Sequence, residues 1–380
     1  MYKTITDFIK NIYDHQSTIN LHEPRFIGNE KKYLAECIDS TFVSYVGAFV
    51  TSFEERIKAY TGAKYAVAMA NGTLAQHLAL RVCGVVHDDE VITQALTFVA
   101  TANAITYIGA HPIFLDSDTD TLGLSPEKLF TFLKNETLKK ADGFNYNKKS
   151  GRRISACIPV HVFGHPARID DIVQICNDNN ILVIEDAAES LGSFYQSKHT
   201  GTFGLASVLS FNGNKTITTG GGGMLLTNNE AIATSAKHLS TTAKIPHAWA
   251  FEHDEIGYNY RMPNINAALG CAQMETLDLF LTKKREQAHL YAAFFSKIGV
   301  EFISEPLDCR SNYWLNAIKF KDRTERDAFL TFSHNQGVMT RPTWRLMSQL
   351  PIYKDAECGD LFQAERLEAT LVNIPSSVRV

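Results

Sequence analysis

The segments ISACIPVHV (residues 154–162) and ILVIE (residues 181–185) decide the fold class of this chain. Both are nearly unbroken apolar runs, which are typical of parallel strands covered on both faces. Residues 170–176, which lie between them, have the spacing of a crossover helix. Because strand, helix and strand in this order form a βαβ unit, the sequence predicts an α/β fold with a mostly parallel central sheet.

The same alternation continues on the N-terminal side of these segments. Short apolar runs predict strands at residues 64–70, 90–93 and 112–115, and helical spacing predicts the helices 74–82 and 100–108 between them. Ligands of such sheets bind beyond the carboxyl ends of the strands. We therefore expect the functional residues to follow directly after predicted strands.

The length of the chain predicts a second, smaller domain. A single hydrophobic core stops growing at roughly 250–300 residues, and this chain has 380. We expect a large domain at residues 1–250 and a smaller α+β domain at residues 251–380. Helical spacing across residues 265–298 predicts a long helix that bridges the two domains.

Composition excludes several classes of protein. The chain is 45% hydrophobic and 21% charged, with a formal net charge of −4, which gives no reason to expect a nucleic-acid or membrane partner. No apolar run approaches the roughly 18–20 residues of a membrane span. The seven cysteines are scattered without a Cys-x-x-Cys pair, so we expect no metal site and a cytoplasmic location.

One local exception to the charge balance is residues 134–153, which carry seven basic side chains. Such a run is usually a solvated helix end and loop. The alternative is a patch that attracts an anionic substrate.

The segment SFNGNK (residues 210–215), followed by four glycines at 220–223, is the most informative for function. Lys215 stands at the end of a strand pattern inside a glycine-rich turn, which suits an amine that forms a Schiff base. The other candidates also follow predicted strands, so they are expected to converge on one crevice; they are Asn71-Gly72-Thr73, Phe98, His161 and Asp186.

Each of these candidates also has an ordinary structural interpretation. Asn71-Gly72-Thr73 before a helix forms either an anion site or a capped turn. Asp186 is either a partner for a cation or a helix N-cap. Ser210 either donates a hydrogen bond to a bound phosphate or is a polar residue at the end of a strand. Phe98 either stacks on the ring of a ligand or belongs to the core.

A larger set of motifs stands along the chain in a fixed order: Phe53-Glu54, Tyr60-Thr61-Gly62-Ala63, Asn71-Gly72-Thr73, Thr97-Phe98, Ala102-Asn103-Ala104-Ile105, Pro159-Val160-His161-Val162-Phe163-Gly164, Glu185-Asp186-Ala187-Ala188, Ser210-Phe211 to Lys215, and Gly257-Tyr258-Asn259-Tyr260-Arg261-Met262. From about residue 28 to 375, the chain resembles the DegT/DnrJ family of sugar aminotransferases. The resemblance implies the fold-type I, aspartate-aminotransferase-like scaffold.

The resemblance also implies a cofactor, pyridoxal 5'-phosphate, with pyridoxamine 5'-phosphate as the intermediate. By position, Lys215 forms the internal aldimine and Asp186 pairs with the ring nitrogen. Phe98 stacks on the ring, while the phosphate is held by Gly72, Thr73 and Ser210. Asn259 is expected to reach the phosphate of the neighbouring subunit, so the resemblance implies a homodimer with two shared sites.

Two positions depart from the family pattern. Asn71 stands where serine is usual, and Glu189 stands where glutamine is usual. Glu189 is expected beside the ring hydroxyl, where its carboxylate would need a proton or a nearby cation. Three further residues are expected to contact substrate, namely His161, Arg341 and Trp344. For Arg341, whose planar fork suits oxyanions, a surface ion pair is the alternative.

The implied reaction moves the amino group of L-glutamate to the C4 ketone of a nucleotide-linked 4-keto-6-deoxy sugar, in bacterial surface-glycan biosynthesis. Arg341-Pro342-Thr343-Trp344 and the basic stretch resemble most the enzymes of legionaminic acid and bacillosamine-type pathways, which act on UDP-linked N-acetylhexosamines. The alternatives are an amino-acid aminotransferase or decarboxylase and a non-catalytic regulatory protein that binds the cofactor. A dehydratase of this fold has histidine in place of Lys215, and a nicotinamide enzyme would show Gly-x-Gly-x-x-Gly after its first strand.

Overall fold

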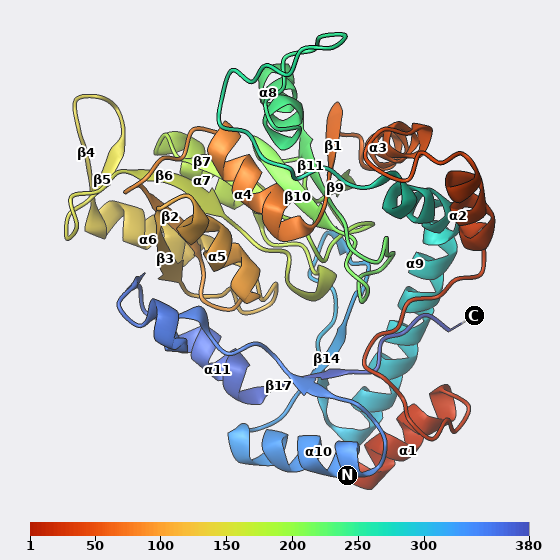
Figure 1. Cartoon of the computed structure of the whole chain (residues 1–380). Helices are drawn as coiled ribbons and strands as arrows, with labels where there is room; N and C mark the ends of the chain where they lie inside the picture. The colour runs from red at the N-terminus through yellow and green to blue at the C-terminus, as the bar shows by residue number, and fades with distance from the viewer. Residues whose placement is uncertain (380) are drawn as a thin grey trace.

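A mostly parallel sheet of eight strands forms the centre of the computed structural model, which describes residues 1–379 (Figure 1). The strand order is β1-β11-β10-β7-β6-β2-β3-β16. Only β11 runs antiparallel to its neighbours, β1 and β10. The strands are β1 (Tyr65–Met69), β2 (Glu90–Gln94), β3 (His111–Leu115), β6 (Ile154–Ile158), β7 (Leu182–Asp186), β10 (Ala206–Ser210), β11 (Gly223–Thr227) and β16 (Glu357–Cys358).

Helices cover both faces of this sheet, as the apolar strand runs predict. Val91 and Ile92 are adjacent on β2 and both fully buried, yet they belong to hydrophobic clusters on opposite faces. The covering helices are α3 (Ala48–Thr61), α4 (Gly72–Val82), α5 (Val99–Tyr107), α6 (Pro126–Glu136), α7 (Ile169–Asp178) and α8 (Glu230–Ser240).

The predicted strand at 154–162 is too long, because β6 ends at Ile158. Pro159 has no N–H to donate to a ladder. The next residue, Val160, makes only an isolated bridge with Asp186. The chain then turns through the short helix η1 (Val162–Gly164).

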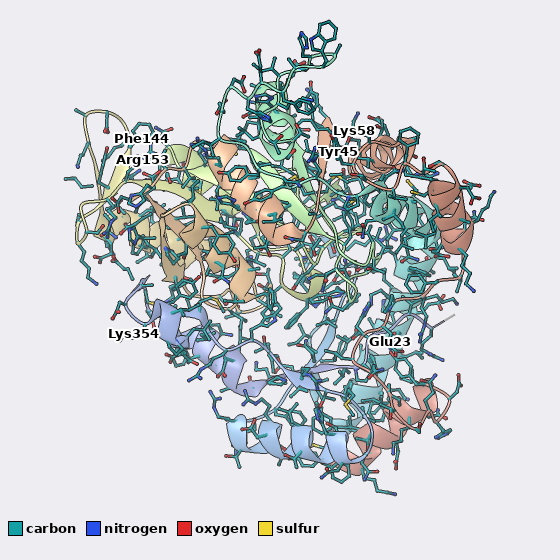
Figure 2. All side chains as sticks on the ribbon, viewed as in Figure 1. Glu23, Tyr45, Lys58, Phe144, Arg153 and Lys354 are labelled. Carbon is teal, nitrogen blue, oxygen red and sulfur yellow. The ribbon has the colours of Figure 1, made fainter. Side chains whose placement is uncertain are left out.

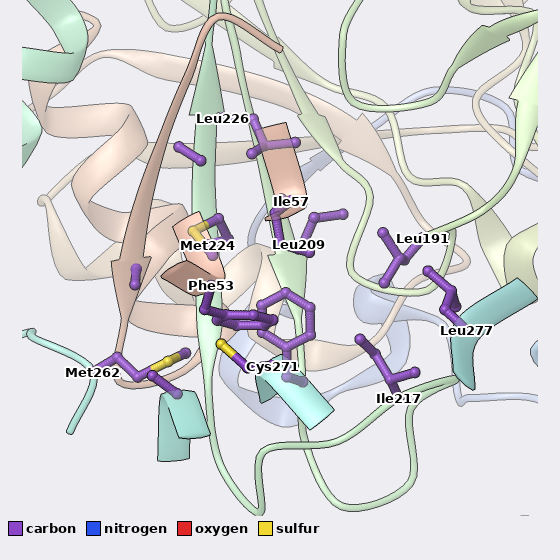
Figure 3. Close-up of a cluster of buried hydrophobic side chains, with 14 of the residues drawn as sticks. Phe53, Ile57, Leu191, Leu209, Ile217, Met224, Leu226, Met262, Cys271 and Leu277 are labelled. Carbon is purple, nitrogen blue, oxygen red and sulfur yellow. The ribbon is translucent and has the colours of Figure 1, made fainter. Parts of the chain in front are cut away.

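A third cluster anchors the loop after β10 (Figure 3). Phe211 is fully buried, and its ring centroid lies 4.9 Å from that of Phe53 on α3. Ile217 is 1% exposed in the same cluster. The loop between Phe211 and Ile217, which carries Lys215, is therefore fixed at both ends by core packing.

The C-terminal part of the chain forms a second, antiparallel sheet in the order β12-β14-β17-β15. The long helix α9 (Asn264–Ile298) connects it to the large sheet and ends at Gly299, whose φ of 69° is left-handed. The other elements here are α1 (Tyr2–Ile12), β12 (Glu301–Phe302), β14 (Asn316–Lys319), α10 (Arg323–Asn335), β15 (Arg341–Pro342), α11 (Phe362–Thr370) and β17 (Leu371–Ile374).

The N-terminal helix α1 packs with this second sheet. Ile5 and Ile9 are fully buried in one cluster with Tyr291, Phe295 and Ile318. The division into residues 1–250 and 251–380 stays a prediction. Although α1 is within residues 1–250, it packs with elements of residues 251–380.

The basic stretch at 134–153 forms the end of α6 and the hairpin of β4 (Thr137–Lys139) and β5 (Asn145–Asn147). Arg153, labelled in Figure 2, pairs with Asp89 at 2.6 Å and lies over the ring of Phe144. Asp89 precedes the amino end of β2, opposite the strand ends where ligands are expected. The alternative that this basic stretch attracts an anionic substrate is therefore not supported.

The remaining elements are α2 (Glu30–Asp39), β8 (Phe194–Tyr195), β9 (Lys198–His199), β13 (Cys309–Arg310), η2 (Met347–Gln349) and η3 (Pro351–Tyr353).

Candidate active site

A pocket of about 360 Å³ lies at the carboxyl ends of β7 and β10, beside the N-terminus of α4. It gathers most of the residues predicted from sequence, although they come from distant parts of the chain. Those that line it are Gly72, Thr73, Phe98, Asp186, Glu189, Ser210, Lys215 and Trp344.

Lys215 lies inside this pocket, and its side chain is 14% exposed. Its Nζ is 3.4 Å from Oε1 of Glu189 and 3.9 Å from the centroid of the Trp314 ring. The indole of Trp314 donates to the carbonyl oxygen of Asn214 at 2.6 Å, so the ring is held against the loop. The amine is thus confined between an aromatic face and a carboxylate.

Asp186 ends β7 with its carboxylate in the pocket. Oδ2 accepts a hydrogen bond of 2.8 Å from the hydroxyl of Thr101, and Oδ1 accepts one of 3.1 Å from the amide of Ala188. Turns, and no α-helix, follow Asp186 in the chain, so the N-cap alternative is not supported. Two donors therefore fix the orientation of this carboxyl group inside the pocket.

Glu189 is buried, with its side chain 5% exposed. Oε2 accepts the backbone N–H of Phe163 at 2.9 Å, and Oε1 faces Lys215. Burial raises the pKa of Glu189 to about 7, against the opposing effect of Lys215. Its carboxyl group can therefore gain or lose a proton near neutral pH.

The start of α4 has the features that suit an anion. Asn71 caps the helix, its Oδ1 accepting the amide of Leu74 at 2.9 Å. Gly72 and Thr73 occupy the first turn, where backbone amides have no partner within the helix and favour an anion. Ser210 lies so close that a Cβ on Gly72 would stand 3.1 Å from the Ser210 Cβ. These donors together suit a phosphate.

Two aromatic side chains, Phe98 and Trp344, form another wall of the pocket. Phe98 precedes α5 and is 53% exposed, so it does not belong to the core. Its ring centroid lies 6.4 Å from that of Trp344. An exposed ring on a pocket wall can stack on a planar ligand.

His161 lies outside the pocket, contrary to the expectation that it contacts substrate. It is fully buried, Nδ1 accepts the amide of Ala167 at 3.0 Å, and Nε2 lies 3.1 Å from Oε2 of Glu185. Since Nδ1 is an acceptor, Nε2 carries the hydrogen and donates it. The early end of β6 turns the ring toward β7, where its role is structural.

Arg341 and Asn259 also lie away from the pocket lining. Arg341 is exposed on β15, where its Nη1 donates to the carbonyl oxygen of Thr340 at 2.9 Å and lies beside His334. It does not line the pocket, although Trp344, which follows the same strand, does. Asn259 is exposed, and its Oδ1 accepts two hydrogen bonds from Arg261. Its contact with a neighbouring subunit stays a prediction.

The sequence matches the description "DegT/DnrJ/EryC1/StrS aminotransferase family" over residues 24–380. The chain belongs to this family. It is 38% identical over 337 residues to the GDP-perosamine synthase of Escherichia coli O157:H7, covering 89% of this chain and 87% of that protein. It is also 38% identical over 356 residues to the putative pyridoxal phosphate-dependent aminotransferase EpsN of Bacillus subtilis (strain 168), covering 91% and 89%.

The fold agrees with this family membership. The aminotransferase TlmJ from Streptoalloteichus hindustanus superposes with a TM-score of 0.85 at 26% identity, over 94% of this chain and 93% of that one. The predicted fold class is thereby confirmed.

The protein is a pyridoxal-phosphate-dependent aminotransferase, and the chemistry of its pocket fits that cofactor. An amine, a carboxyl group, the N-terminus of a helix and an exposed aromatic ring line one cavity. Lys215 would attach the cofactor, Asp186 would face its ring nitrogen, and Gly72, Thr73 and Ser210 would hold its phosphate. Within residues 1–379, no group of three His, Cys, Asp or Glu side chains is placed to hold a metal ion.

Three pocket residues were not predicted. Trp314 lies under Lys215, Thr101 supports Asp186, and Gln76 lines the cavity from α4. Only Gln76 had a signal in the sequence, since it is one helical turn beyond Gly72. It is 2% exposed, and neither of its amide atoms has a hydrogen-bond partner within residues 1–379.

Proposed function

We propose that this protein transfers the amino group of L-glutamate to the C4 ketone of a nucleotide-linked 4-keto-6-deoxy sugar. The observation that carries the proposal is the single pocket that joins Lys215, Asp186 and the anion site of α4. This pocket occurs in a chain 38% identical, over 89% of its length, to a protein named GDP-perosamine synthase.

The residues of the pocket divide the work of this reaction. When bound, pyridoxal phosphate supplies an electron sink for the carbon that loses a proton. Lys215 is the group placed to move that proton, since its Nζ lies inside the cavity. Asp186, held in place by Thr101 and Ala188, would face the nitrogen of the cofactor ring. Trp314 excludes water from one side of the amine.

The proposal also has to specify which nucleotide is attached to the sugar. The sequence motifs favour a UDP-linked sugar of the legionaminic acid or bacillosamine type, whereas the names of several relatives favour a GDP-linked sugar. Because three relatives named GDP-perosamine synthase are 38%, 35% and 33% identical to this chain, we give the GDP-linked sugar precedence. Either product would enter a surface glycan.

We further propose that the protein acts as a homodimer. Exposed apolar side chains support a contact with a second copy, because soluble monomers rarely expose large apolar patches. Trp249, Phe251 and Ile256 are at least 80% exposed on the loop before Asn259, and Figure 1 shows that segment projecting beyond α8.

No helix within residues 1–379 is both long and apolar enough to cross a bilayer.

The test is to incubate the purified protein with pyridoxal phosphate, L-glutamate and a panel of GDP-, UDP- and dTDP-linked 4-keto-6-deoxy sugars. NMR of the product identifies the sugar, the aminated carbon and its configuration. Lys215→Ala is the control and should form no amino sugar. Transfer between amino acids without any amino sugar would instead indicate an amino-acid aminotransferase. A cofactor spectrum that glutamate does not change would indicate a binding protein without catalysis.

A further inference from the structure

The charges around Lys215 are unbalanced. Glu189 and Asp186 both line the pocket that holds its single ammonium group, and both carboxylates are less than a tenth exposed. Burying a carboxylate without a partner costs several kcal/mol. The number of protons in this cluster therefore depends on which carboxylate has partners of its own.

Asp186 has such partners, and Glu189 depends on Lys215. Asp186 accepts from the Thr101 hydroxyl and the Ala188 amide, neither of which changes charge. Glu189 has one neutral donor, the Phe163 amide, and its other oxygen faces Lys215 at 3.4 Å. When Lys215 becomes neutral, Glu189 loses the charge of the one cation that faces it within residues 1–379. Its carboxylate is then the group in the cluster that protonation stabilises most.

A primary amine must be neutral before it can attack a carbonyl group. We propose that Glu189 is the internal proton acceptor of Lys215, taking the ammonium proton when the lysine reacts with its cofactor. In that step the proton passes from Nζ to Oε1, which gives a neutral amine and a carboxylic acid. The amine then condenses with the aldehyde of pyridoxal phosphate: a C=N bond forms, the C=O bond breaks and water leaves. This inference rests on the assignment of Lys215 as the attachment point.

An internal acceptor changes how cofactor capture depends on pH. Because the proton stays inside the pair, the neutral amine formed by transfer to Glu189 is a constant fraction of the singly protonated pair, and the rate through this route does not change with pH between the two ionisations. Without Glu189, the amine must release its proton to solvent, and the neutral fraction rises about tenfold per pH unit. The other titratable groups nearby are Asp186, which accepts hydrogen bonds from two neutral donors, and His22, whose pKa burial lowers well below its usual value.

The test is the rate at which the cofactor-free protein captures pyridoxal phosphate, followed by the absorbance of the bound cofactor in a stopped-flow instrument. From about pH 7 to about pH 9, the wild-type rate should vary by no more than about twofold. The rate for Glu189→Gln should rise about tenfold per unit. Glu189→Asp keeps a carboxyl group, so it should restore the flat profile at a lower rate. Asp360→Asn, which breaks the exposed ion pair with Lys128, should behave as the wild type.

Two outcomes overturn the inference. One is a tenfold rise per unit in the wild-type protein, a result that needs no variant to fold. The other is a flat profile for Glu189→Gln. Lys215→Ala separates this failure from that of the proposed function: if it captures the cofactor with the wild-type spectrum, Lys215 is not the attachment point. If it does not, and Glu189→Gln is flat, only the role of Glu189 falls.

Discussion

Thr101 links Thr97 to Asp186 through its hydroxyl, which lies 2.9 Å from the hydroxyl oxygen of Thr97. The Thr101 hydroxyl donates to the buried carboxylate of Asp186 at 2.8 Å. Because a hydrogen bond to a charged group contributes about 1.5–3 kcal/mol, we expect Thr101→Val to lower the free energy of unfolding by about that amount. The matched control is Thr106→Val on the same helix, whose hydroxyl donates to two neutral groups, the Ala102 carbonyl and the Tyr353 hydroxyl. Denaturant unfolding measures both, and equal losses would contradict a special role for Thr101.

The sequence predicts the pocket residues that follow strand ends and fails for those that come from elsewhere. Lys215, Asp186 and Ser210 could be predicted because parallel strands end at one edge of a sheet. Trp314 could not, since it reaches its partner Asn214 across 100 positions of chain. His161 was misplaced because its predicted strand ends early, and no local pattern shows that its ring turns toward Glu185.

At the scale of elements, the start of α4 depends on its fit against β11. A Cβ on Gly223 would stand 2.5 Å from the backbone carbonyl of Asn71 and 2.7 Å from the amide nitrogen of Gly72. Backbone atoms cannot rotate away, so Gly223→Ala should displace the helix start and cost about 1–3 kcal/mol of stability. Because the phosphate donors move with it, pyridoxal phosphate should bind about tenfold more weakly.

Gly221 gives a matched control in the same run of glycines. A Cβ there would have its nearest neighbour at 4.0 Å, an ordinary contact. Gly221→Ala should therefore keep the wild-type melting temperature and the wild-type affinity measured by cofactor titration. If both variants lose affinity equally, the loss belongs to the glycine run as a whole and not to the helix start.

Helices and strands could be predicted from the sequence where burial of apolar side chains alone determines them. The apolar runs of β6 and β7 indicate burial on both faces, and the structure confirms it. Strand β11 was not predicted, because the glycines before it indicate only turns, whereas its pairing with β1 and β10 is decided by segments far away in the sequence. Local patterns report burial and turns; they do not report which strands will pair.

At the scale of the whole molecule, Lys284 joins the N-terminal segment, α9 and the C-terminal segment. It is fully buried and donates to the carbonyl oxygens of Trp314 and Ser376, with His22 at 3.0 Å. Burial lowers the pKa of Lys284 to about 7, against about 10.4 in an unfolded chain. Between these values the unfolded chain binds a proton that the folded protein does not, so stability rises with pH.

We therefore expect the free energy of unfolding to increase from about pH 7 to about pH 9, by up to about 1.4 kcal/mol per pH unit from this group. Lys284→Met should remove that part of the slope. The neighbouring Lys283 is on the same helix but pairs with Glu286 in solvent, so Lys283→Met should keep it. Unfolding followed at several pH values measures the slopes, and identical slopes for all three proteins would show that Lys284 does not set the dependence.

The proposed sharing of active sites between two copies predicts a result that no single variant can give. If Asn259 of one copy completes the pocket that contains Lys215 of the other, then Asn259→Ala and Lys215→Ala are each inactive as pure dimers. In a mixed dimer, one site carries both substitutions and the other site carries neither. Random mixing makes about half of the dimers mixed, each with one intact site, so the mixture should recover about a quarter of the wild-type activity.

Subunits exchanged in mild denaturant and assayed after dilution provide the measurement, with sedimentation confirming the dimer. If Asn259 instead served its own chain, no mixed dimer would contain an intact site, and the mixture would stay inactive.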